Sequence, residues 1–182
     1  MDSAGRRIKL DGIDGSGVKT LMADAGLTNG AFYAHFESKD HLVTEVVATQ
    51  LAAQLERFAD IPLGVAGAEE LVRLYLTTEH RDSPAQGCPS AALLDEIARA
   101  PQATREAYTV GTMAIVDELA SRLSTEQQPE QRLRALSLYA LLIGTLQLSR
   151  ALTDRELADD LLTQGAENVL DLIARGLIDN RD

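Results

Sequence analysis

Residues 26–39 read GLTNGAFYAHFESK, and this stretch decides the fold of the N-terminal part of the chain. Gly26 follows an apolar-periodic segment and can adopt the left-handed conformation that ends a helix. Thr28 is a capping residue placed to open the next helix. Phe32 and Phe36 are four residues apart and therefore share one face of that helix. The pattern predicts a helix-turn-helix whose second helix runs from Thr28 to Phe36.

The second helix of this motif has an apolar back and a polar front. The polar side chains that fall on the front are Thr28, Asn29, Tyr33 and His35. Ser38 is placed to cap a further helix that begins at Lys39. A helix with an anchored back and a free polar front, held beside a turn, is typical of proteins that read the major groove of double-stranded DNA. The pattern therefore favours DNA as the ligand.

The same stretch resembles the recognition helix of TetR-type transcriptional repressors. The residues that carry the resemblance are Gly26, Thr28, Gly30, Tyr33, His35, Phe36, Ser38 and Lys39. The resemblance implies an all-α homodimer that binds a palindromic operator and is released by a small-molecule inducer. We expect a three-helix DNA-binding domain in residues 1–43 and a helical ligand-binding and dimerisation domain in residues 44–182.

The longer side chains of the polar front have predicted roles at the DNA. Tyr33 and Lys39 are expected to bind phosphates and set the register of the protein on the duplex. His35 is expected to contact a further phosphate, more strongly when it is protonated. Asn29 can reach a base edge in the major groove, where an amide pairs bidentately with adenine.

Three small residues complete the predicted interface. Thr28 is expected to cap its helix and touch the DNA backbone, and Gly30 to let the DNA approach closely. TetR-type proteins commonly place Ser or Thr directly before the equivalent of Val18, where this chain has Gly17. Ser16 lies one position earlier, and we expect it to cap the second helix and contact phosphate.

The chain is acidic, and the acidic residues are unevenly distributed. The net charge of the 182 residues is −11, of which residues 1–43 contribute −1 and residues 44–182 contribute −10. Non-specific attraction to DNA scales with the local number of cations. Residues 1–43, the predicted DNA-reading head, are nearly neutral, so we expect modest non-specific affinity. The acidic remainder repels DNA and leaves the head as the favoured contact.

The rest of the sequence predicts helices. Leu and Ala dominate, aromatic residues make up 4%, and Trp is absent, a composition that favours an all-helical protein. After a first helix of one and a half to two turns within residues 1–10, helices are expected at 18–25, 28–36, 39–58, 69–78, 88–99, 101–123, 130–152 and 157–177. Turns or loops are expected at residues 11–17, 59–67, 80–87 and 124–128.

The two C-terminal segments, 130–152 and 157–177, carry more apolar surface than one subunit can bury. Ser137, Ala140 and Gly144 are small enough to let another helix approach closely. A symmetric dimer through a four-helix bundle is the economical solution. The most apolar run, residues 135–148, is shorter than the roughly 20 residues that span a bilayer, so no membrane association is expected.

A small-molecule cavity among the helices of the second domain follows from the resemblance. The residues expected to line it are Tyr75, Cys88, Tyr108, Met113 and Gln147. Pockets between helices are typically apolar with a few polar groups, and ordinary core packing accounts for each residue equally well. Cys88 begins a helix beside Pro89, so its thiol is either activated by the helix dipole or buried as a small apolar side chain. This single cysteine excludes an intrachain disulfide and fits a reducing cytoplasm.

No catalytic residue, metal site or cofactor is expected. His35, His41 and His80 lack the spacing of a metal-binding set, and residues 11–17 lack the ligand spacing of a calcium loop. The rival to a repressor is a helical dimeric module that binds a small molecule or a protein and has lost effective DNA binding. The short first helix and the neutral head motivate that alternative.

Overall fold

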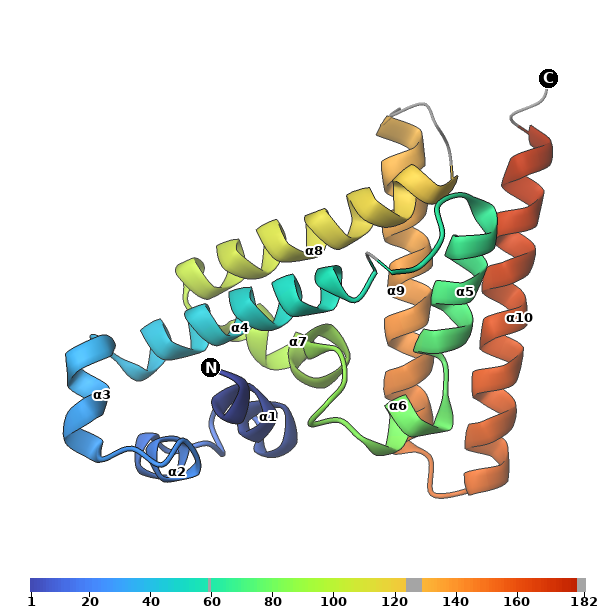
Figure 1. Ribbon diagram of the computed structural model, residues 1–182. Helices are drawn as coiled ribbons and strands as arrows, with labels where there is room; N and C mark the ends of the chain where they lie inside the picture. Colours follow the sequence, from blue (N-terminus) through green and yellow to red (C-terminus); the bar gives the residue numbers. More distant parts are fainter. Residues whose placement is uncertain (59, 124–128, 180–182) are drawn as a thin grey trace. The chain divides into compact units, whose positions relative to one another are not determined.

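A computed structural model describes residues 1–58, 60–123 and 129–179, and these residues form ten α-helices and no strand (Figure 1). The helices are α1 (Asp2–Asp11), α2 (Val18–Asp24), α3 (Asn29–His35), α4 (Lys39–Glu56), α5 (Val65–Tyr75), α6 (Thr78–Asp82), α7 (Pro89–Arg99), α8 (Gln102–Leu123), α9 (Pro129–Ala151) and α10 (Arg155–Asp179). The predicted all-α class is confirmed. The loop predicted at residues 124–128 lies outside the described residues. No helix in the described part of the chain is long and apolar enough to cross a membrane.

Three predictions of local secondary structure were wrong. The break predicted at residues 59–67 is too long, because helix α5 already begins at Val65. Helix α1 has 10 residues, so it is about a turn longer than expected, and it ends where Gly12 adopts a φ of +81°. The polar loop predicted at residues 80–87 begins with helix α6 instead. The Thr77 hydroxyl accepts the His80 N–H at 3.1 Å and caps this helix, a local signal that a polar sequence conceals.

The contacts divide the chain into two compact units. The first unit joins Met1–Gln54 to Ser83–Thr112, and the second joins Leu55–Asp82 to the residues from Met113 onward. The first unit therefore includes α7 and the start of α8 as well as the helix-turn-helix. These two units are defined by contacts within the chain, whereas the boundary predicted between residues 43 and 44 divides DNA binding from ligand binding. That functional boundary stays a prediction.

The first unit buries one apolar core behind the helix-turn-helix. Helix α1 packs on α2 and on α7, and α2 packs on α3. The largest fully buried side chains here come from five helices: Ile8, Leu21, Phe32, Leu42, Val43, Val46, Val47, Leu51 and Leu93. A Cβ at Gly111 of α8 would lie 2.7 Å from the Leu51 side chain, so α4 and α8 pack closely.

The turn between α2 and α3 is a Schellman motif centred on Gly26. Gly26 has a φ of +69°, and its N–H donates to the Ala23 carbonyl at 3.0 Å. The Leu27 N–H donates to the Met22 carbonyl at 2.8 Å. These bonds satisfy carbonyls that the end of α2 leaves without intrahelical partners. The predicted left-handed glycine is confirmed, and it sets the direction in which the chain enters α3.

The second unit is built on the antiparallel pair α9 and α10, with α5 packed on α10 and α6 on α9 (Figure 1). A Cβ at Gly165 would lie 2.5 Å from the Thr145 methyl group, so α10 approaches α9 closely there. Arg81 is 5% exposed and pairs with Asp82 and Asp159, which fastens α6 to α10. The Arg122 guanidinium donates to the carbonyls of Phe58 and Ile61 and holds the segment after α4.

Replacing Gly26 with alanine should destabilise the protein by about 1–2 kcal/mol, because an L-residue at this φ carries a left-handed strain. No atom lies within 4 Å of the added Cβ, so the cost is in the backbone alone. Gly17→Ser is the matched control: its Cβ also meets open space, but its φ is −76° and the hydroxyl can cap α2. Denaturant unfolding at fixed protein concentration compares them, and equal stability of the two variants would contradict the assignment.

Candidate nucleic-acid interface

Helix α3 is held by its aromatic back. Phe32 is 1% exposed, and its ring lies 5.6 Å from that of Phe36. The Tyr33 ring meets Phe32 edge-on, with centroids 5.0 Å apart and an interplanar angle of 87°. Tyr33 is nevertheless 74% exposed. The buried neighbour therefore steadies the base of the ring while the phenol projects into solvent.

The start of α4 is fixed directly behind α3. The His41 N–H donates to the Ser38 hydroxyl at 3.1 Å, which confirms the predicted cap. The His41 ring returns an interaction to the preceding turn, where its Nδ1 accepts the Glu37 N–H at 3.3 Å, one residue before the N–H that a capping box uses. Lys39 is the first residue of α4, where a cation opposes the helix dipole. The charge of this lysine is therefore unfavourable to the helix dipole, and an anion outside the chain would complement it.

The polar front of α3 is open to solvent. Thr28, Asn29, Gly30, Tyr33 and His35 are all exposed, and Lys39 is half-buried. Thr28 occupies the N-cap position with φ −86° and ψ 157°, but its side chain makes no capping bond. The expectation that its hydroxyl caps the helix was therefore wrong.

Ser16 does not cap α2 either. The N-cap of α2 is Gly17, which has no side chain to offer, and Ser16 is 0% exposed. The Ser16 hydroxyl donates to the Gly12 carbonyl at 2.7 Å and so closes the turn that follows α1. Its one-residue displacement from the cap turns the side chain inward, and a buried hydroxyl is not placed to contact phosphate in this conformation.

Neither the backbone conformation nor the space around Gly30 requires a glycine at this position. It has no positive φ, and a Cβ there would meet only the Thr28 hydroxyl at 3.9 Å, an ordinary contact. Glycine is nonetheless a poor helix former, by about 1 kcal/mol relative to alanine in a helix interior. The residue leaves an uncovered stretch of backbone on the exposed front of α3.

The cations of the head divide into inward and outward sets. Arg7 donates to Asp24 at 2.7 Å and to Asp11 at 3.0 Å, and Lys9 donates to the Gly87 carbonyl at 2.8 Å. The hydrogen bond from Arg7 holds the pKa of the Asp24 carboxyl below its usual value. Arg7 and Lys9 thus serve the fold. The other three cations of residues 1–43 are Arg6 and Lys19, which are exposed, and Lys39.

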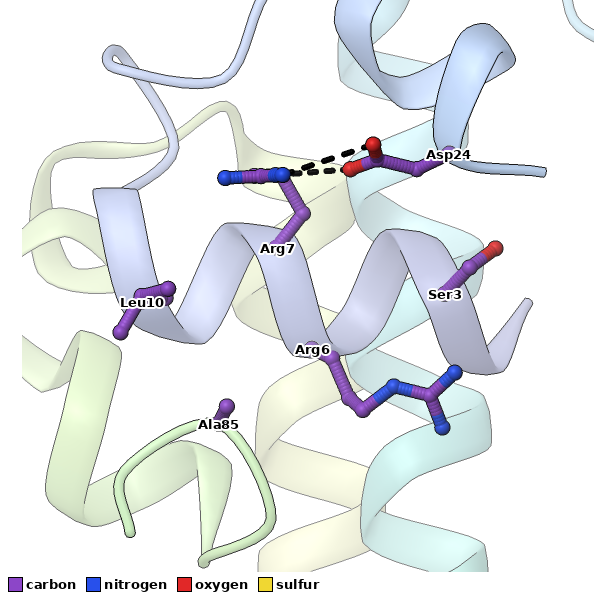
Figure 2. Close-up of a pocket in the computed structure, with 6 residues that line it drawn as sticks. All are labelled: Ser3, Arg6, Arg7, Leu10, Asp24 and Ala85. Atoms are coloured by element: carbon purple, nitrogen blue, oxygen red, sulfur yellow. Dashed lines mark hydrogen bonds and ion pairs between the residues drawn. The ribbon is translucent and has the colours of Figure 1, made fainter. Parts of the chain in front are cut away.

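Figure 2 shows the division around α1, with Arg7 turned toward Asp24 and Arg6 turned to the opposite side of the helix. A surface hollow of about 280 Å³ lies here, lined by Ser3, Arg6, Arg7, Leu10, Asp24 and Ala85. Arg6 and Lys19 are not among the residues predicted from the sequence to contact DNA. Lys19 is exposed on α2, whose buried residues are Leu21 and Met22.

The residues predicted to line a ligand cavity fall in both compact units. Tyr108 and Cys88 belong to the first, where the Tyr108 hydroxyl donates to the Ser90 hydroxyl at 3.1 Å and Cys88 is buried at the N-cap of α7. The other three, Tyr75, Met113 and Gln147, belong to the second. Tyr75 is buried, and its ring lies 6.3 Å from that of Tyr139. Their shared role in ligand binding stays a prediction.

Comparison with known proteins bears on both the sequence and the fold. The sequence model for bacterial regulatory proteins of the tetR family matches residues 1–46. No curated protein sequence matches the chain. The solved structures that share its fold include the reduced form of NemR from E. coli, with 20% identity, 92% of each chain covered and a TM-score of 0.75.

Two further structures show the same likeness. SCO4454, a TetR-family transcriptional regulator from Streptomyces coelicolor, has 22% identity over 94% of this chain and 92% of its own, with a TM-score of 0.66. The transcriptional regulator FadR from Bacillus subtilis, solved in complex with stearoyl-CoA, has 16% identity over 94% of both chains and a TM-score of 0.66. Residues 1–46 thus match the sequence model of the tetR family of bacterial regulatory proteins, and the whole chain shares its fold with solved TetR-family regulators.

Proposed function

We propose that the protein is a ligand-responsive repressor that binds a palindromic operator as a homodimer. Residues 1–43 form its DNA-reading head, and residues 44–182 bind an inducer and dimerise. The observation that carries the proposal is the front of α3, where Asn29, Tyr33 and His35 are exposed while Phe32 anchors the back. A repressor of this kind acts in the cytoplasm, where its DNA lies.

Tyr33 and Lys39 are the phosphate contacts of the proposed head. The phenol of Tyr33 projects from a steadied ring, and Lys39 begins α4, where free backbone N–H groups add to its positive charge. A helix N-terminus and a lysine together favour a phosphate. Asn29 and Gly30 begin α3, the end of the recognition helix that enters the major groove.

Tyr33→Ala combined with Lys39→Ala should abolish saturable binding to the DNA upstream of the protein's own gene, as measured by gel shift. Lys39→Ala alone should weaken binding to all sequences similarly and reduce the slope of log affinity against log salt by about 1. Arg73→Ala is the charge-matched control, because Arg73 is an exposed cation of the second compact unit.

If the folded, dimeric wild type does not bind that DNA at low salt, the repressor proposal fails and the ligand-binding module without DNA affinity takes its place. If wild type binds and the double variant binds equally well, the protein reads DNA through another surface. An equal loss in Arg73→Ala would show that net charge alone sets the affinity.

Gly30→Ala should separate stability from function. Alanine is the better helix former and meets no obstacle within the chain, so the free energy of unfolding should rise by up to about 1 kcal/mol. The added methyl group lies on the face proposed to meet DNA, and operator affinity should fall by on the order of tenfold, or about 1.4 kcal/mol. A variant that is more stable and binds DNA as well as wild type would remove Gly30 from the interface.

The proposed dimer interface includes an exposed stripe on α9. Its residues recur at helical spacing and carry no charge: Leu133, Ser137, Ala140, Leu141, Gly144 and Leu148. Leu133 is 65% exposed, and a Cβ at Gly144 would meet nothing within 4 Å. An apolar stripe left open along a long helix is the surface that a two-fold related copy can cover. Helix α10 packs beside α9 and would complete a four-helix bundle.

Leu141→Glu should convert the dimer to monomers, because each copy would bury a carboxylate against the other. Leu74→Glu is the matched control: Leu74 is 57% exposed on α5, outside the stripe, against 45% for Leu141. Analytical ultracentrifugation over a range of concentrations measures the outcome. If Leu141→Glu remains as dimeric as the control, the stripe does not form the interface.

The inducer would act through a difference in its affinity for two conformational states of the ligand-binding domain, residues 44–182. Tyr75, Cys88, Tyr108, Met113 and Gln147 remain the proposed lining of its site. Helix α4 runs without interruption from Lys39 of the head to Glu56 of the second compact unit, so it is the proposed transmitter. The stearoyl-CoA complex of the Bacillus subtilis regulator makes acyl-CoA compounds a reasonable first panel for binding assays.

A further inference from the structure

The turn between α1 and α2 is held by a carboxylate from far along the chain. Glu96 lies on α7, and its Oε2 accepts the N–H of Ile13 at 2.6 Å and that of Asp14 at 3.4 Å. The side chain is half-buried. A carboxylate that accepts backbone N–H groups makes charge-assisted hydrogen bonds, which are stronger than neutral ones. Besides the Ser16 hydroxyl, this turn is thus supported by a side chain from outside residues 1–46.

Gly12 makes room for this contact. A Cβ at Gly12 would lie 2.9 Å from Glu96 Oε1 and 3.1 Å from Oε2, closer than the two groups can approach without a shift. The glycine also has a φ of +81°, which L side chains rarely adopt. The residue at position 12 is therefore fitted both to the end of α1 and to the approach of Glu96.

A second polar contact joins the same two parts of the chain. Lys9 is 7% exposed, and its Nζ donates to the carbonyl of Gly87, which directly precedes the N-cap of α7. One end of α7 is thus connected to α1, and Glu96, in the third turn of α7, is connected to the residues after α1. Helix α7 also packs on α1.

We propose that Glu96 is a positioning residue of the DNA-reading head, which it serves by fixing the turn that leads into α2. Helix α2 begins at Val18, four residues after Asp14, and its far end is fixed by the Arg7–Asp24 ion pair. With both ends of α2 fixed, the Schellman turn at Gly26 delivers α3 in one orientation. The proposal rests on the proposed function only for its DNA readout.

A positioning role for Glu96 and a simple effect of its charge predict opposite changes in DNA affinity when Glu96 is removed. Glu96 adds a negative charge to the unit that carries the head, so removing it should strengthen attraction to phosphates if charge alone mattered. A positioning role predicts the opposite, because a displaced α2 places α3 poorly for the major groove. Asp95, the exposed neighbour of Glu96 on α7, offers the same charge change and is not bonded to the turn through these N–H groups.

The experiment compares Glu96→Ala, Glu96→Gln and Asp95→Ala in the full-length protein. The probe is a duplex selected from random sequences by the wild type. Glu96→Ala should weaken specific binding by about tenfold, a usual cost of losing hydrogen bonds to a charged group. Glu96→Gln keeps an acceptor oxygen and should recover most of the affinity. Asp95→Ala should bind the duplex as tightly as wild type or more tightly.

Amide hydrogen exchange in the free protein reads the positioning directly. The Ile13 and Asp14 amides and those of α2 and α3 should lose protection in Glu96→Ala and regain it in Glu96→Gln, while the α9 and α10 amides keep theirs. Unchanged protection of the turn, or DNA binding by Glu96→Ala equal to that of wild type, overturns the proposal. If wild type binds no DNA, the proposed function fails separately, and the exchange result alone decides the role of Glu96.

Discussion

The head depends on the burial of Phe32 behind a turn that only Gly26 makes without strain. The Phe32 ring is fully covered, so it fixes the rotation of α3 about its own axis and determines which side chains face outward. The left-handed Gly26 fixes the angle at which α3 leaves α2. Together these constraints place Asn29, Tyr33 and His35 in solvent. A helix of 7 residues has little stability of its own, so tertiary packing must supply what length does not.

The head has a net charge of −1, and two of its five basic side chains are used within the fold. Arg7 is engaged by two aspartates, and Lys9 is turned into the protein, so residues 1–43 offer fewer cations to DNA than their composition suggests. The proposed phosphate contacts then come from a few placed groups, among them Lys39 at the start of α4. A protein of this kind has little non-specific affinity to add to its specific contacts. The precision with which α3 is held therefore matters more for binding than it would in a strongly basic head.

Much of the fold could be predicted from local sequence signals. Gly26 ends α2, Ser38 caps α4, and Pro89 opens α7, because each signal acts through its own backbone or that of its immediate neighbours. The errors came where a distant partner decides the outcome. Ser16 turns inward to the Gly12 carbonyl, and α6 is stabilised by Arg81, whose partner Asp159 is remote in sequence. The exposed front of α3 was predictable from the positions of Phe32 and Phe36, whereas the inward use of Arg7 and Lys9 was not.

Glu96 shows why a sequence motif and a physical unit need not coincide. Residues 1–46 carry the family resemblance because the helix-turn-helix signals are local, yet the turn after α1 is held by a side chain 83 residues beyond Ile13. Nothing in the spacing around Glu96 marks it, since a carboxylate on an amphipathic helix ordinarily faces water. What marks it is Gly12, which leaves space for it, and the backbone N–H groups of Ile13 and Asp14, which lie between α1 and α2 and donate to it. A backbone donor in a turn needs a partner, and here the fold supplies it from α7. A shift of α7 would therefore move the carboxylate that accepts the N–H groups of the turn before α2.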